Sequence, residues 1–144
     1  MLEVRDFTVS YGESEVVHQV GFEAGEGEIL AVMGRNGMGK STLFKSLIGI
    51  LPSRAGSLKL AGTDLASMPS HQRVAHGLAY VPQGRMVFPA LTVMENVLTG
   101  LRNRKDNIPE EIFSLFPILR DMANRKAGNL SGGQQQQLVI ARAL

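Results

Sequence analysis

The sequence has 144 residues and contains no cysteine, no long apolar run and no leader-like N-terminus. Without cysteine, neither a disulfide framework nor a thiolate metal site can form. The longest aliphatic run, residues 29–33, is far shorter than the roughly 20 apolar residues that a transmembrane helix needs. Residues 1–6 lack the basic region and apolar stretch of a secretory signal. These absences predict a soluble, cytosolic domain of ordinary size.

Charge is also sparse, since charged residues make up 19% of the chain, and it is unevenly distributed. Residues 1–28 hold seven acids and one base, so the remaining residues hold 14 bases and 6 acids, a net charge of +8. A basic body favours an anionic partner, although a solvated basic surface explains the same numbers. No Lys/Arg-rich run marks a nucleic-acid-binding arm, and we expect no nucleic-acid partner.

Hydrophobic periodicity predicts several strands. Leu2, Val4, Phe7 and Val9 alternate with polar residues apart from one slip, and a second strand at 16–22 follows a turn at 11–14. Residues 57–60 alternate in the same way before a turn at 61–64. Continuous apolar runs at 28–33 and 78–81 predict strands that are buried on both faces.

Helical spacing follows the first buried run and dominates the second half of the chain. Apolar residues between 43 and 51 predict a helix that Pro52 ends. Thr92 with Glu95, and Ser131 with Gln134, form capping-box patterns at the starts of two further helices. Residues 109–111, a proline and two acids, suit a first helical turn, and residue 117, a proline, kinks or ends that segment.

The loop at 34–41 has the P-loop pattern G-x-x-x-x-G-K-[ST]. A triphosphate requires converging backbone N–H groups, and glycines let the backbone approach it. We expect Lys40 to bind the outer phosphates as a mobile cation and the Ser41 hydroxyl to bind Mg²⁺. The predicted strand before the loop and helix after it supply the required context. The predicted phosphate-binding residues are Gly34, Arg35, Asn36, Gly37, Met38, Gly39, Lys40, Ser41 and Thr42.

Two other classes of P-loop protein fit less well. A guanine-reading Asn/Thr-Lys-x-Asp motif is approached only at residues 103–106, where the order of residues is wrong. Nucleotide kinases need an arginine-rich lid, and Arg102, Arg104 and Arg120 are too scattered to form one.

A second glycine-containing motif, Leu-Ser-Gly-Gly-Gln, occupies residues 130–134. Its helix start could present backbone N–H groups to a second anion. An isolated Ser-Gly-Gly is more often a capped helix after a tight turn, but an upstream P-loop favours the anion site. The predicted binding residues here are Ser131, Gly132, Gly133 and Gln134.

Together, the two motifs resemble those of the ATP-binding subunits of ABC transporters, and the resemblance covers residues 2–144. It implies that 34–41 is the Walker A loop and 130–134 the signature motif. It also implies that Gln83 is the Q-loop glutamine, which contacts Mg²⁺ and water and senses the membrane partner. Tyr11 stands where the family stacks a ring on adenine, although a packed turn residue explains a tyrosine beside a glycine equally well.

The resemblance implies an α/β fold: a P-loop NTPase core of the ABC ATPase type with an antiparallel β subdomain and a helical subdomain. Residues 1–144 would be a partial ABC ATP-binding domain. Residues 1–82 would form the β subdomain and P-loop core, residues 83–130 the Q-loop and helical subdomain, and residues 131–144 the signature helix. Catalytic roles fall on Lys40 and Gln83, metal contacts on Ser41 and Gln83, and the cofactors are ATP and Mg²⁺.

The residues around these motifs indicate a branch of the family. Residues 80–85 and 88–93 look like the branched-chain amino-acid transporter subfamily. The residues Gly-Arg-Asn-Gly at 34–37 and the four glutamines at 134–137 are more like its urea-importing branch. The resemblance therefore favours import of urea or a short amide, with branched-chain amino acids as the alternative.

The family mechanism also implies partners. Two ATPase subunits, paralogous or identical, would face each other head to tail at the cytoplasmic face of the plasma membrane and drive transmembrane permease subunits. The apolar residues 86–91, which include Phe88, are either a docking surface for a permease or part of the core.

The family's Walker B aspartate, catalytic glutamate and switch histidine follow the signature helix and would lie after residue 144. His18, His71 and His76 all precede the signature and are predicted to be surface residues. We therefore expect an N-terminal fragment that is inactive alone as an ATPase. A naturally short, nucleotide-responsive subunit and a non-transport ABC ATPase of translation or DNA repair are alternatives.

Overall fold

The computed structural model describes residues 1–101 and 107–144, which form two compact units. The β unit comprises residues 1–78 and the helical unit residues 79–144. The near match to a guanine-reading motif at 103–106 lies outside the described residues. Each unit has its own buried core.

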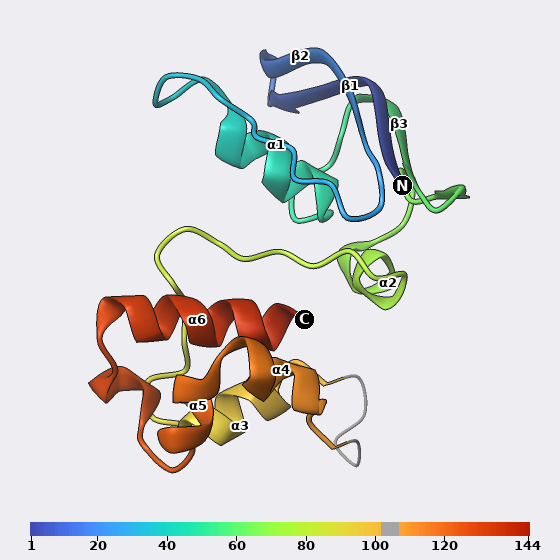
Figure 1. Cartoon of the computed structure of the whole chain (residues 1–144). Coiled ribbons are helices and arrows are strands. Elements are labelled where there is room, and N and C mark those ends of the chain that lie inside the picture. The colour runs from blue at the N-terminus through green and yellow to red at the C-terminus, as the bar shows by residue number, and fades with distance from the viewer. Residues whose placement is uncertain (102–106) are drawn as a thin grey trace. The chain divides into compact units, whose positions relative to one another are not determined.

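The β unit is built on a four-stranded antiparallel sheet (Figure 1). The strand order is β2-β1-β3-β4, with β1 at Leu2–Tyr11, β2 at Ser14–Ala24, β3 at Ala55–Leu60 and β4 at Thr63–Asp64. The predicted hairpin and the turn after β3 are confirmed. The slip in the alternation is a register shift between Val4 and Phe7, where Asp6 has a φ of +49°.

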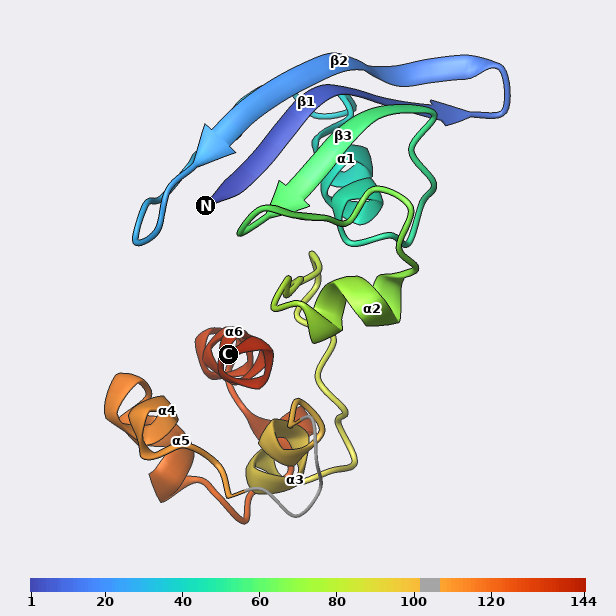
Figure 2. The same cartoon turned by 90° about the vertical axis from the view of Figure 1, so that its right-hand side faces the viewer.

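Helix α1 (Lys40–Leu47) packs against one face of this sheet (Figure 2). The helix ends earlier than Pro52 because Gly49 is left-handed at a φ of +84°. A shorter helix, α2 (Ser70–Ala75), follows β4. The buried core of the unit consists of Val4, Phe7, Val9, Val17, Leu43, Leu47, Leu58 and Leu65.

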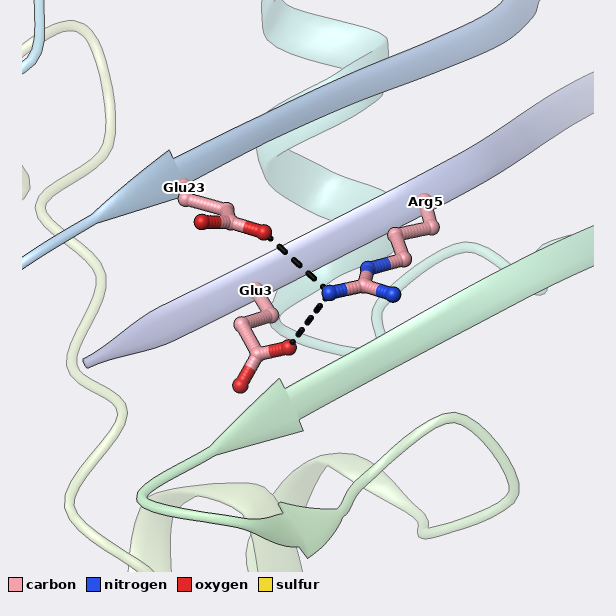
Figure 3. Close-up of polar contacts among 3 residues, drawn as sticks. All are labelled: Glu3, Arg5 and Glu23. Atoms are coloured by element: carbon pink, nitrogen blue, oxygen red, sulfur yellow. Dashed lines mark hydrogen bonds and ion pairs between the residues drawn. The ribbon is translucent and has the colours of Figure 1, made fainter.

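The other side of the sheet carries a small charge cluster (Figure 3). Arg5 donates to Glu3 at 3.1 Å and to Glu23, on the neighbouring strand, at 3.2 Å. The Arg5 side chain is exposed, so each pair contributes at most about 1 kcal/mol to stability. The three histidines are also exposed, as predicted, and His18 lies 3.0 Å from Glu15.

The helical unit contains α3 (Val93–Leu98), α4 (Glu110–Leu115), α5 (Pro117–Asp121), a 3-10 turn (Ala127–Asn129) and α6 (Gly132–Ala143). Both predicted capping boxes are present, at Thr92–Glu95 and at Ser131–Gln134. The buried core consists of Val93, Val97, Ile112, Leu119, Ala127, Leu130, Leu138 and Ala141. Within the described ranges, every helix is too short or too polar to cross a bilayer.

The two strands predicted to be buried are wrong as local elements. Neither 28–33 nor 78–81 is a strand, and Ile29 is 99% and Met33 85% exposed. A continuous apolar run becomes a strand only when neighbouring strands satisfy its backbone. Among the residues that the structure describes, no strand pairs with either run, so neither run becomes a strand.

Candidate nucleotide-binding site

The loop at 34–39 ends in a left-handed residue that starts α1. Gly39 is the N-cap of α1 with a φ of +83°, and a Cβ added to it would lie 2.8 Å from the carbonyl oxygen of Val16. Both facts exclude larger residues, because the conformation disfavours a Cβ and β2 leaves no space for one. The end of the loop therefore packs directly against the backbone of β2.

Lys40 folds back across this loop. Its ammonium Nζ donates to the carbonyl oxygen of Gly34 at 2.6 Å and to that of Arg35 at 2.8 Å. The cation therefore lies inside the loop's own curve, and the first turn of α1 contains no acidic residue that would repel an anion. A cation, glycines and the unpaired first-turn amides of a helix form a donor set that fits a phosphate chain.

The other predicted residues of the β unit surround this loop or lie beyond it. Asn36, Gly37, Met38 and Ser41 are exposed, and Thr42 is half-buried. Tyr11 ends β1 opposite Ser14 and is 50% exposed. Its role as an adenine-stacking residue stays a prediction.

The helical unit holds the second set of predicted residues. The Ser131 hydroxyl accepts from the amide of Gln134, and Gln134 Oε1 accepts from the amide of Ser131 at 2.9 Å. Gly133 has open space around it, whereas Gly132 lies under the guanidinium of Arg85. The motif is thus a well-capped helix start with one side open.

Gln83 is exposed and precedes a left-handed turn at residues 84–86. The structure brings Lys40 together with Gly34 and Arg35 in the β unit. It places Gln83 and the Ser131–Gln134 capping box in the helical unit.

Three residues of the helical unit escaped the sequence analysis. Asn96 is fully buried, Arg85 covers Gly132, and Arg142 contacts Met86 and Phe88. None belongs to a side-chain pattern, since Asn96 and Arg142 bond to backbone carbonyls, and that of Met86 is far from Arg142 in sequence. The only available signal for Asn96 was a polar residue on the apolar side of a helix.

The fold and the loop define a P-loop nucleotide-binding protein. The family model described as "ABC transporter" matches residues 17–144, and the chain belongs to this family. Its relatives include the high-affinity branched-chain amino acid transport ATP-binding protein BraG of Pseudomonas aeruginosa. The two are 38% identical over all of this chain and 64% of the relative. A probable LivF protein of Archaeoglobus fulgidus is also 38% identical, over 63% of its length. The chain thus spans 64% and 63% of the length of these two curated relatives.

Solved structures agree on the fold. A nucleotide-free ATP-binding cassette of an ABC transporter superposes with a TM-score of 0.84 at 26% identity, over all of this chain and 64% of that one. A dimeric cassette in a post-hydrolysis state, bound to ADP and phosphate, superposes with a TM-score of 0.81 at 26% identity, over 100% and 69%. The predicted fold class, an ABC ATPase fold with an antiparallel sheet and helices, is confirmed.

Proposed function

We propose that this chain is the ATP-binding and ATP-hydrolysing subunit of an ABC importer, or the nucleotide-binding part of one. The observation that carries the proposal is the position of Lys40. Its ammonium donates to the carbonyls of Gly34 and Arg35, and the residue directly follows the left-handed Gly39. A triphosphate offers this cation stronger acceptors than two neutral carbonyls do.

Each residue of the loop has a separate task in this proposal. The amides of 37–42 bind the phosphate oxygens, and Lys40 neutralises the outer phosphates. The hydroxyl of Ser41 and the amide oxygen of Gln83 are hard donors that suit Mg²⁺, which would neutralise charge developing on the phosphates. Tyr11 stacks on the adenine. Residues 1–82, 83–130 and 131–144 serve as P-loop core, helical subdomain and signature helix.

The signature residues act on a second subunit. Ser131, Gly132, Gly133 and Gln134 would face the outer phosphate held by Lys40 of a paralogous or identical partner. The open side of Gly133 leaves room for that phosphate. The dimeric form of a related cassette that holds ADP and phosphate supports this arrangement.

The helical unit offers a surface for the permease subunits at the cytoplasmic face of the membrane. Met86 and Phe88 are 64% and 49% exposed, so the core interpretation does not account for them, while Val87 packs inward. Replacing Phe88 with Asp should uncouple transport and leave the soluble ATPase activity intact. If both activities fall together, Phe88 serves the fold.

The solute we propose is urea or a short amide, because the residues at 34–37 and the glutamines at 134–137 resemble those of the urea-importing branch. Branched-chain amino acids are the second candidate, supported by the names of two relatives. Uptake of labelled urea and of labelled leucine by cells with and without the gene separates them. Loss of leucine uptake alone would reject urea.

The nucleotide proposal is tested by titrating ATP with Mg²⁺ into the protein and into two lysine variants. Lys40→Ala should lower ATP affinity at least about tenfold, since a charge-assisted phosphate contact contributes a few kcal/mol. Lys45→Ala, an exposed lysine on the same helix, is the matched control and should bind like the parent. Equal affinity in the parent and Lys40→Ala would reject the site.

A further inference from the structure

Residues 84–86 form a strained turn in the helical unit. Gly84, Arg85 and Met86 have φ values of +93°, +66° and +34°, and the amide of Met86 donates to the carbonyl of Gly84 at 2.8 Å. This is a three-residue turn whose centre is a non-glycine residue with positive φ, which is rare and unfavourable. Such a turn persists only where the surroundings hold it.

Two side chains hold the segment that follows the turn. Asn96 accepts from the amide of Phe88 at 2.8 Å and donates to its carbonyl at 3.0 Å. Arg142, on α6, donates from Nη2 to the carbonyl oxygen of Met86 at 3.0 Å. Its guanidinium carbon also lies 5.1 Å from the centre of the Phe88 ring, within the range of a cation–π contact.

The backbone of Arg142 is itself fixed, which sets the direction of its side chain. A Cβ on Gly100, just after α3, would lie 2.1 Å from the carbonyl oxygen of Arg142, so the two backbones are in direct contact. The guanidinium is partly buried, and this burial lowers its pKa. Its Nη1 is buried and has no hydrogen-bond partner within the described residues. The guanidinium is thus held by one hydrogen bond and one ring contact, both to the segment 86–88.

We propose that Arg142 is a positioning residue that fastens the strained turn at 84–86, and with it the exposed ring of Phe88, to the helix that begins with the signature motif. The turn directly follows Gln83. A displacement of Phe88 is therefore transmitted to α6 through Arg142, and the other end of the same helix starts at Ser131. The expected effect on ATP turnover rests on the proposed function. The contact of Arg142 with residues 86–88 is a property of the helical unit and does not depend on it.

The connection is tested by amide hydrogen exchange on the protein with Arg142→Gln and Arg142→Lys. In Arg142→Gln, amides of 84–88 should exchange at least about fivefold faster. The reason is that the Met86 carbonyl loses the hydrogen bond from Arg142 and the Phe88 ring loses its cation–π partner. In Arg142→Lys the increase should be smaller, since an ammonium can still donate to the Met86 carbonyl. Amides of α4 and α5 should be unchanged in both variants.

The matched control is Arg120→Gln. Arg120 lies 4.8 Å from the ring centre of Phe113 and pairs with Glu110, so it has the same kind of contacts in the same unit without touching 84–88. It should leave exchange at 84–88 at the parent rate. Uniformly faster exchange across the helical unit in Arg142→Gln, or unchanged exchange at 84–88, would overturn the proposal.

The functional readout separates positioning from general stability. In the subunit assembled with its partners, Arg142→Gln should lower ATP turnover about three- to tenfold. The ATP affinity should stay within about twofold of the parent, because Arg142 contacts Met86 and Phe88 and none of the proposed binding residues. A combined loss of affinity and turnover would overturn the positioning role. If Lys40→Ala leaves ATP affinity unchanged, the proposed function fails. The exchange at 84–88 in Arg142→Gln still decides whether Arg142 fastens the turn.

Discussion

The carbonyl oxygen of Val16 lies 2.8 Å from the place that a Cβ of Gly39 would occupy, so β2 and the end of the phosphate loop are in backbone contact. This contact makes Gly39 different from Gly37, another glycine of the loop with positive φ. Gly37 has almost the same φ, +82°, but open space around it.

The pair Gly39→Ala and Gly37→Ala therefore separates conformational strain from steric clash. Gly37→Ala should cost only the left-handed penalty, about 1 kcal/mol. Gly39→Ala should cost about 2 kcal/mol more, because β2 or α1 must also move. Urea unfolding followed by circular dichroism measures both. Equal losses would mean that the loop moves away from β2 without cost.

Arg73 is expected to be a main stabilising residue of the β unit. It is 3% exposed, and its guanidinium donates to four backbone carbonyls, those of Ser46, Leu47, Ala66 and Met68. Arg73→Met should lower the free energy of unfolding by about 3 kcal/mol, because buried carbonyls lose their partners. Arg73→Lys should recover only part of this, since one ammonium cannot reach all four.

The control for Arg73 is Arg54→Met, which changes an exposed arginine of the same unit. Its effect should stay within about 0.5 kcal/mol. The two variants are compared by thermal and urea unfolding. A loss in Arg54→Met as large as that in Arg73→Met would show that the charge, and not the hydrogen bonds, is responsible.

The two capping boxes should differ in their response to pH. Glu95 accepts from the Thr92 amide at 2.7 Å, and this backbone hydrogen bond, with that from the Thr92 hydroxyl, lowers the pKa of Glu95 below its ordinary value of 4.5. The cap on α3 is therefore complete above pH 4.5 and is lost as the pH falls through the lower pKa of the folded state.

The equivalent residue on α6 is Gln134, which carries no charge. In a proton–nitrogen NMR titration, the Thr92 amide should shift with a midpoint below 4.5, and the Ser131 amide should show no transition in this range. A Thr92 midpoint at or above 4.5 would contradict the role of the backbone hydrogen bond.

Asn96 should be the most sensitive polar position of the helical unit. Its amide is fully buried and joins the backbone of Phe88 to that of Thr92. Asn96→Ala should lower the free energy of unfolding by about 2–3 kcal/mol, because the Phe88 amide and carbonyl lose their partner. Asn124→Ala, an exposed control, should change it by less than about 0.5 kcal/mol.

Local signals predicted the local structure well. The hairpin, the bulge near Asp6 and both capping boxes follow from residues that contact neighbours close in sequence. The apolar runs at 28–33 and 78–81 failed as strand predictions because a buried strand depends on partners that hydropathy does not supply.

The phosphate loop was predictable because its residue types and spacing are dictated by the phosphate itself. The buried polar side chains that hold each unit together were not predictable. Arg73, Asn96 and Arg142 bond mainly to carbonyls, which every residue possesses, so no sequence pattern marks their partners. Only the folded backbone brings donor and acceptor together.

The strand order β2-β1-β3 has a kinetic consequence for the phosphate loop. The loop and α1 lie within the long chain segment between the end of β1 at Tyr11 and the start of β3 at Ala55. Pairing β1 with β3 closes this segment and pays a chain-entropy cost that the β1–β2 hairpin does not. We therefore expect the β1–β2 hairpin to form first, and the segment that carries the phosphate loop to close only when β3 joins β1.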